Sequence, residues 1–302
     1  MSTRRSLLAA SLAVALAATV NSPVRAQGKI PVVVTFSILG DLVKNVGGDR
    51  VEVVPLVGPD GDAHVYSPSP ADAKKIADAK VVFTNGLGFE GWMPRLIKAS
   101  GTKAAVVVAT KGIRPRKMQG SDEHGHAETD PHAWQSVSNA KIYVANIREA
   151  LIQADPSGKS VYEASAAAYL SKLDALDQEM KEAVARIPAD RRKIISSHDA
   201  FGYFEAAYGI DFVAPQGVST ESDVSAKDVA KIISQIKKQK SIAIFLENIT
   251  DPRLMKRISA ETGARIGGTL YSDALTGEKG EAPTYIDMMR HNIKTLSVAL
   301  MG

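Results

Sequence analysis

The longest helical pattern in the chain covers residues 156–187. Asp155 comes just before Pro156, and a short polar residue followed by proline is typical of a helix start. Residues 159–187 contain no glycine or proline, and Pro188 then ends the helix. Apolar residues recur at steps of three and four, with one step of five, as on one face of a helix: Val161, Ala164, Ala168, Leu173, Leu176, Met180, Val184 and Ile187.

The length of this helix limits what the chain can fold into. At about 1.5 Å per residue it is about 45 Å long, which is more than one small domain needs. We therefore expect it to connect two domains. Asp177 and Lys181 are four residues apart, so we expect an ion pair on its solvent-exposed side. A coiled coil is the alternative interpretation, and the strand-like segments on both sides of the helix argue against it.

Short apolar, β-branched segments alternate with helical patterns on both sides of the long helix. They cover residues 30–38, 51–57, 80–85, 104–109, 193–197, 211–215 and 241–246. Such alternation predicts βαβ units and a mainly parallel sheet in each half. We therefore predict an α/β fold of two lobes, each a mainly parallel sheet flanked by helices. The N-terminal lobe is residues 27–155, the long rigid connecting helix is 156–187 and the C-terminal lobe is 188–302.

Residues 1–26 have the pattern of a secretory signal peptide. Arg4 and Arg5 precede an apolar run over residues 7–20, and small residues surround the predicted cleavage after Ala26. The start also resembles a twin-arginine signal, and ordinary Sec export is an equally open alternative. We expect the mature chain to be a soluble periplasmic protein.

Charge and cysteine content exclude several classes of partner. The chain has 37 basic and 33 acidic residues, and three of the basic residues are arginines of the signal peptide. The mature chain is therefore nearly neutral, which gives no support for binding to nucleic acid or an anionic membrane surface. The chain has no cysteine, so it offers no disulfide, no cysteine metal site and no lipid-anchor cysteine. We expect a monomer.

Four residues stand out at the ends of strand-like segments. They are His64, His132, His198 and Asp273. Each is weak alone, because a loop histidine is usually only solvated and a loop aspartate is most often a turn residue. As a set they are stronger, because ligands bind at the carboxyl edge of open α/β sheets. Two come before the long helix and two after it, so they can meet only between the two lobes.

Three imidazoles and one carboxylate form a four-coordinate N/O set that suits Zn²⁺, whereas Mg²⁺ and Ca²⁺ prefer more carboxylates. Histidine must be neutral to bind metal, so we expect affinity to fall as pH drops through about 6.5. A zinc hydrolase is the alternative from another class. It needs an open coordination position and a general base, and no His-Glu-x-x-His motif is present. The adjacent Ser197, His198 and Asp199 cannot point at one another as a catalytic triad.

The chain resembles the periplasmic solute-binding proteins of zinc- and manganese-uptake ABC transporters. Matching stretches run over nearly the whole mature length and cover residues 62–73, 130–140, 197–204, 217–221 and 267–275. The resemblance implies a metal-binding protein without enzymatic activity. It also implies that Zn²⁺, or alternatively Mn²⁺, is delivered to a membrane permease. It places the metal ligands at His64, His132, His198 and Asp273.

Two parts of the resemblance bear on the cargo. Manganese-type members have glutamate at the third ligand position, where this chain has His198. The long histidine-rich loop of some zinc members is reduced to His124 and His126 in an acidic segment. That segment could hold an ion weakly and receive it from a periplasmic metallochaperone, or it could be only a solvated loop.

Overall fold

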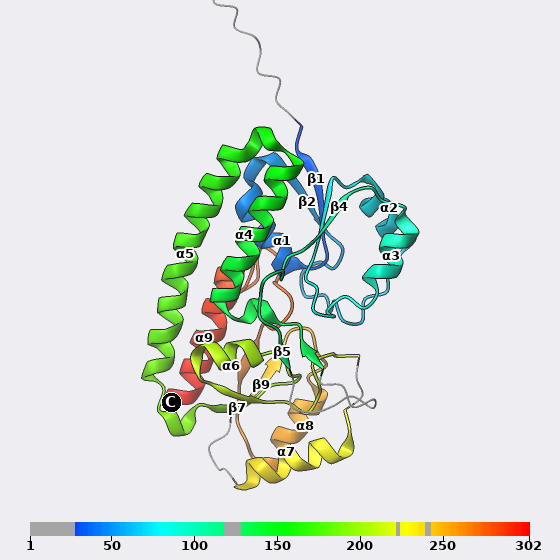
Figure 1. Cartoon of the computed structure of the whole chain (residues 1–302). Helices are drawn as coiled ribbons and strands as arrows, with labels where there is room; N and C mark the ends of the chain where they lie inside the picture. Colours follow the sequence, from blue (N-terminus) through cyan, green and yellow to red (C-terminus); the bar gives the residue numbers. More distant parts are fainter. Residues whose placement is uncertain (1–27, 118–127, 222–223, 239–242) are drawn as a thin grey trace, which may run out of the picture.

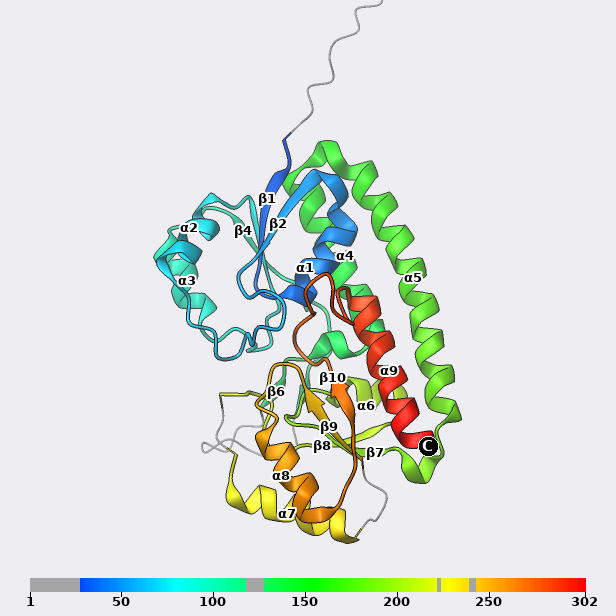
Figure 2. The same ribbon diagram turned by 180° about the vertical axis from the view of Figure 1, so that it is seen from behind.

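The computed structural model describes residues 28–117, 128–221, 224–238 and 243–302. Two four-stranded sheets lie at opposite ends of the molecule, and one long helix passes along both (Figures 1 and 2). Every strand pair within the two sheets is parallel. This confirms the predicted α/β fold of two lobes with parallel sheets.

The N-terminal sheet has the strand order β2-β1-β3-β4. Its strands are β1 (Ile30–Val34), β2 (Val51–Pro55), β3 (Val81–Thr84) and β4 (Ala105–Val108). Alternate side chains point to opposite faces of the sheet. Val33 and Val82 pack toward α2 (Pro70–Asp78) and α3 (Met93–Ser100). Their neighbours pack toward α1 (Ser37–Gly47) and α4 (Val137–Ala154).

The C-terminal sheet has the order β10-β9-β7-β8. Its strands are β7 (Lys193–Ile195), β8 (Asp211–Val213), β9 (Ala243–Glu247) and β10 (Ile266–Leu270). The helices of this lobe are α6 (Gly202–Tyr208), α7 (Ala226–Lys238), α8 (Arg253–Thr262) and α9 (Tyr285–Met301). Ile195 and Ile244 pack with α7 and α8, whereas Ile194 and Phe245 belong to the larger core.

A close approach of helix to sheet explains one glycine in β10. A Cβ atom on Gly267 would lie 2.7 Å from the Phe245 ring and 2.8 Å from Cβ of Ala299 in α9. Only glycine fits at this position without a shift of one of these neighbours. A short antiparallel pair, β5 (Arg116–Lys117) with β6 (Thr129–Asp130), was not predicted from the sequence.

The long helix is α5 (Lys159–Arg186), preceded by a 3₁₀ turn over Pro156–Gly158. The second half of the predicted buried face, from Leu173 to Ile187, is buried as expected. The first half is wrong, because Val161 is 41% exposed and Ala164 and Ala168 are also exposed. Tyr162 and Tyr169 are buried in their place. Their hydroxyls donate to Asp155 and Asp41, which lets the aromatic rings enter the core.

Asp177 departs from its predicted solvent-exposed position. It forms the expected ion pair with Lys181, at 2.7 Å, but its side chain is buried. The Tyr208 hydroxyl of α6 donates to it at 2.9 Å. The residue therefore links α5 to the C-terminal lobe as well as forming a helix-surface pair.

One hydrophobic core spans both lobes. It joins Val34 and Phe83 of the N-terminal sheet with Ile194, Phe245 and other residues of the C-terminal sheet through α1, α4, α5 and α9. Figures 1 and 2 show α9 lying beside the C-terminal part of α5. In the part of the chain that the structure describes, no helix has the length and apolar character needed to cross a membrane.

Candidate metal centre

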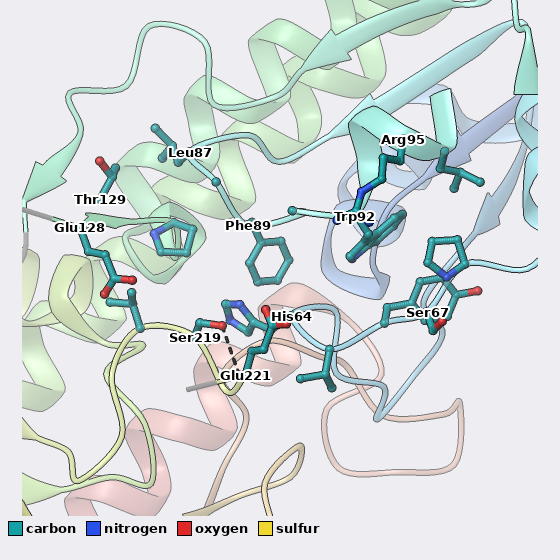
Figure 3. A pocket seen from close by; sticks show the side chains of 18 of the residues that line it. His64, Ser67, Leu87, Phe89, Trp92, Arg95, Glu128, Thr129, Ser219 and Glu221 are labelled. Atoms are coloured by element: carbon teal, nitrogen blue, oxygen red, sulfur yellow. Dashed lines mark hydrogen bonds between the residues drawn. The ribbon is translucent and has the colours of Figure 1, made fainter. Parts of the chain in front are cut away.

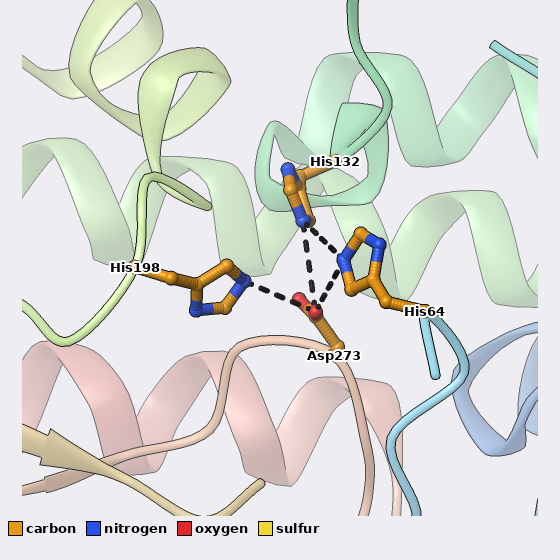
Figure 4. A group of neighbouring side chains, drawn as sticks. All are labelled: His64, His132, His198 and Asp273. Carbon is orange, nitrogen blue, oxygen red and sulfur yellow. Dashed lines mark hydrogen bonds and ion pairs between the residues drawn. The ribbon is translucent and has the colours of Figure 1, made fainter. Parts of the chain in front are cut away.

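The structure brings together all four residues singled out in the sequence. One nitrogen from each of His64, His132 and His198 and one oxygen from Asp273 lie within 4.8 Å of one another (Figure 4). His64 is in the loop between β2 and α2, and His132 is between β6 and α4. His198 follows β7, and Asp273 follows β10. The group therefore sits between the lobes, near the carboxyl ends of strands from both sheets.

Four of the six distances between the ligand atoms are close to the edges of a tetrahedral ion site. Oδ2 of Asp273 lies 3.2 Å from Nε2 of His64, 3.2 Å from Nε2 of His198 and 3.6 Å from Nε2 of His132. The Nε2 atoms of His64 and His132 are 3.2 Å apart. A regular tetrahedron with metal–ligand bonds of about 2.0–2.2 Å has edges of about 3.3–3.6 Å. The geometry and the donor atoms therefore both suit one Zn²⁺-sized ion.

The four side chains are almost inaccessible to solvent. His64 is 9% exposed, and the other three are 0% exposed. Burial lowers the pKa of His132, but the Asp273 and Asp130 carboxylates outweigh burial and raise it to about 9. Burial also lowers the pKa of His198, and Glu247 and Asp273 raise it well above its ordinary value.

The pKa of Asp273 is shifted in the opposite direction to those of His132 and His198. Burial raises the pKa of its carboxyl group, but the neighbouring His132 and His198 hold that pKa well below its usual range. The carboxylate is therefore ionised at any physiological pH. Protons on the imidazoles and a divalent cation compete for this same negative charge.

Two carboxylates outside the group of four face the imidazoles from behind. Oδ1 of Asp130 accepts hydrogen bonds from the backbone N–H and Nδ1 of His132, both at 2.9 Å. Oε2 of Glu247 lies 2.6 Å from Nδ1 of His198. Sequence reasoning did not single out Glu247. The sequence did contain one signal for it, because Glu247 is an acidic residue at the end of the apolar β9 segment, at the carboxyl edge of the sheet.

Hydrogen bonds tie the loop of His132 to the loop of Asp273. Nε1 of Trp134 and Nε2 of Gln135 both donate to the Ser272 carbonyl, at 2.9 and 2.7 Å. Nδ2 of Asn85 donates to the carbonyl of Pro131 at 2.9 Å. The two bonds to Ser272 cross from one lobe to the other, and the bond from Asn85 holds the His132 loop within its own lobe, so His132 and Asp273 are positioned together.

The loop that carries His64 is held from both lobes. Oδ1 of Asp62 accepts the His64 backbone N–H at 2.9 Å, and Oδ2 accepts the Thr220 hydroxyl at 2.5 Å. Nε1 of Trp92 donates to the Ala63 carbonyl at 2.8 Å. The Phe89 ring packs edge-on against His64 with centroids 4.7 Å apart. Thr220 links this loop to the C-terminal lobe close to His64. Farther along the same loop, the backbone N–H of Asp60 donates to the Leu275 carbonyl at 2.8 Å, and its carboxylate accepts from Nδ2 of Asn248 at 3.0 Å.

A cavity of about 1360 Å³ opens beside the site (Figure 3). Its described lining comes from both lobes and includes Trp92, Phe89 and Ser219. Of the four grouped residues, only His64 is part of that lining. The ion position is therefore approached on the side of His64.

The other histidines lie outside this group. His124 and His126 fall outside the described residues, so their predicted role in metal capture stays a prediction. His291 is on α9, where its Nε2 lies 3.0 Å from the Thr269 carbonyl.

The family of periplasmic zinc-uptake complex component A (ZnuA) matches residues 32–299. The chain belongs to this family. It is 36% identical over 277 residues to the iron-binding protein YfeA of Yersinia pestis, covering 92% of this chain and 88% of the relative. It is 35% identical over 266 residues to the manganese-binding lipoprotein MntA of Halalkalibacterium halodurans, covering 88% and 87%.

Solved structures of metal-binding proteins have the same fold as this chain. The periplasmic zinc-binding protein TroA from Treponema pallidum has a TM-score of 0.85 at 32% identity, covering 90% of this chain and 99% of that chain. The Mn-bound periplasmic metal-binding protein from Candidatus Liberibacter asiaticus has a TM-score of 0.80 at 31% identity, with the same coverage.

These findings confirm the resemblance described from the sequence. The chain is the metal-binding, substrate-binding component of an ABC transporter, it acts outside the cytoplasm, and a membrane permease is its expected partner. It is not an enzyme, which excludes the zinc-hydrolase alternative.

Proposed function

We propose that this chain is a periplasmic zinc-binding protein that takes up Zn²⁺ between its lobes and delivers it to the permease. His64, His132, His198 and Asp273 serve as the ligands in this proposal. The main support for this proposal is the donor set, in which three imidazole nitrogens and one carboxylate oxygen lie within 4.8 Å of one another. Nitrogen-rich sites favour Zn²⁺ over Mn²⁺ in intrinsic affinity.

The proposal includes the organisation of the chain. Residues 1–26 act as a cleaved export signal, the mature protein works as a monomer, and a periplasmic metallochaperone can act as donor. The lobes are residues 27–155 and 188–302, with residues 156–187 as the connection.

Manganese is the second candidate cargo. Among the described residues, Oδ1 of Asp273 is buried and has no hydrogen-bond partner. If both oxygens of Asp273 bind the ion, the site becomes five-coordinate and gains a second hard oxygen ligand, which suits Mn²⁺ better than a tetrahedron does.

The test is metal analysis of the protein purified from periplasm, together with competitive titration by Zn²⁺ and Mn²⁺ at neutral pH. We expect one zinc per chain and binding of Zn²⁺ at least about 100-fold tighter than that of Mn²⁺. Equal affinity for the two ions, or manganese as the ion found in the purified protein, would refute zinc as the cargo. Binding of neither ion would refute the metal site itself.

A further inference from the structure

The Phe89 side chain lies at the boundary between the cavity and the ion position. It lines the cavity together with His64 and is 2% exposed. Its ring meets the His64 ring edge-on with centroids 4.7 Å apart, and it meets the His132 ring edge-on at 6.1 Å. Figure 3 shows Phe89 and His64 beside each other at the cavity wall. These two rings therefore stand together between the cavity and the buried ligands.

The Phe89 ring is held tightly in the core. It also packs against Phe36 and Trp134, with centroids 5.0 and 4.9 Å apart. Both of these residues are buried. A ring that is in contact with four other rings in a close-packed interior has little room to move. His64, in contrast, is on a loop and borders open space.

The backbone that carries Phe89 has an unusual conformation. Gly86, Leu87 and Gly88 follow one another with positive φ angles of 85°, 56° and 87°. A leucine rarely adopts positive φ, because its Cβ atom then crowds the backbone. Such a conformation persists only where the surrounding structure determines it. The loop before Phe89 therefore needs strong contacts to hold its shape.

The buried carboxylate of Glu90 supplies those contacts. Its Oε1 accepts the Thr35 hydroxyl at 2.5 Å and the Asn85 backbone N–H at 2.6 Å. Its Oε2 accepts the Gly86 backbone N–H at 3.1 Å. Thr35 follows β1, so Glu90 both closes the loop on itself and fastens it to the N-terminal sheet. The loop of residues 85–90 is thus a fixed part of the molecule.

We propose that Phe89 is a positioning residue for metal exchange. It is the fixed wall against which His64 closes, and it keeps Nε2 of His64 directed at the ion. Release begins when the His64 ring swings away from Phe89 toward the cavity. This inference rests on the proposed metal ligands. It assigns a role in exchange to a residue outside the four ligands and to the loop that holds it.

Phe89→Leu and Phe89→Ala test this role by stopped-flow transfer of zinc from the full chain to a chelator. The contact between the two rings exists in the loaded protein and is lost once His64 has moved, so its removal should speed release. An edge-to-face ring pair corresponds to about 2- to 12-fold in an equilibrium constant. We expect release about 3-fold faster in Phe89→Leu and about 10-fold faster in Phe89→Ala, with association changed less than about 3-fold.

Phe36→Leu is the matched control for Phe89→Leu. Phe36 is buried among the same rings, 5.0 Å from Phe89 and 4.8 Å from Trp134, but it is not part of the described cavity lining. It should lower Tm about as much as Phe89→Leu does and leave the release rate within about 2-fold of the wild type. Equal acceleration in this control would show that a looser core is sufficient, and would overturn the inference. An unchanged release rate in both Phe89 variants would also overturn it.

Two further measurements separate positioning from a general structural effect. In a His64→Ala background, Phe89→Ala should speed release by less than about 2-fold, because the ring that it positions is gone. In the metal-free proteins, three-bond coupling constants should show one χ1 rotamer of His64 in the wild type and several in Phe89→Ala. A full additional acceleration in the first measurement, or a single rotamer in both proteins, would overturn the inference. Failure of the wild type to bind zinc would instead refute the proposed function, and the rotamer measurement, which needs no metal, would still decide this inference.

Discussion

Metal binding by this chain should depend on pH well above the usual range of histidine. The pKa of His132 is raised to about 9, and that of His198 is raised in the same direction. An ion must displace these protons, because only a neutral imidazole binds metal. The sequence alone suggested a fall in affinity near pH 6.5. The structure moves the window upward, because Asp273, Asp130 and Glu247 stabilise the protonated rings.

The magnitude follows from the value for His132. With a pKa of about 9, about one site in 1000 has a neutral His132 at pH 6, and about one in 11 at pH 8. Zinc affinity should therefore rise about 90-fold between pH 6 and pH 8 from this group alone. His198 adds to the rise, and Asp273 adds nothing because it stays ionised. About one to two protons should be released for each ion bound at pH 7.

The stability of the metal-free protein should fall as pH rises, whereas zinc affinity rises. A raised histidine pKa contributes stability that is fully present below about pH 6.5 and is lost as pH rises through about 9. The increase in Tm caused by saturating zinc should therefore grow with pH. Competition titrations at pH 6, 7 and 8 and calorimetry in two buffers of different ionisation enthalpy measure both effects. His291→Gln, which changes a histidine outside the site, should leave the profile unchanged.

A change in affinity below about 3-fold between pH 6 and 8, with no proton release at pH 7, would refute this reasoning. It would show that the imidazoles are neutral before the ion arrives. The carboxylates around them would then have been assigned too large an effect.

Two further predictions concern release and selectivity. Thr220→Val removes the hydroxyl that donates to Asp62 and should speed zinc release about 10-fold, measured by stopped-flow transfer to a chelator. Thr220→Ser keeps a hydroxyl and should release at close to the wild-type rate. His198→Glu replaces a nitrogen ligand with oxygen and should narrow the preference for Zn²⁺ over Mn²⁺ at least about 10-fold in competitive titrations. An unchanged release rate in Thr220→Val, or zinc binding indifferent to His198→Glu, would contradict the respective argument.

The fold could be predicted from the sequence because its signals are local. Apolar runs of β-branched residues predicted most of the strands, and uninterrupted helical periodicity predicted α5. The errors in α5 came from tyrosine, whose ring can be buried only if its hydroxyl finds a partner. For Tyr162 and Tyr169 those partners are Asp155 and Asp41, and Asp41 is 128 residues away from Tyr169. Periodicity within one helix carries no information about such a contact.

In the candidate site too, residues with a local sequence signal could be predicted, and residues whose role depends on distant contacts could not. His64, His132, His198 and Asp273 could be selected because each lies at a strand end within a stretch that resembles the family. Glu247 could not be selected, because its role depends on the neighbouring positions of β7 and β9 in one sheet. Parallel pairing of these strands places the end of β9 beside the residues that follow β7. The connection between Glu247 and His198 is therefore a product of sheet topology.

The shared core also bears on how an ion enters and leaves. A wide rotation of the lobes would separate buried side chains of α1, α4, α5 and α9, and would break the bonds from Trp134 and Gln135 to Ser272. Movement of the His64 loop requires far less. Close to His64 that loop is held to the C-terminal lobe by the Thr220 hydroxyl, and its other bonds to that lobe are those of Asp60 with Leu275 and Asn248. His64 alone of the four grouped residues lines the cavity. Since the smaller rearrangement opens the approach to the ion, we expect metal exchange to proceed through this loop while the lobes keep their relative position.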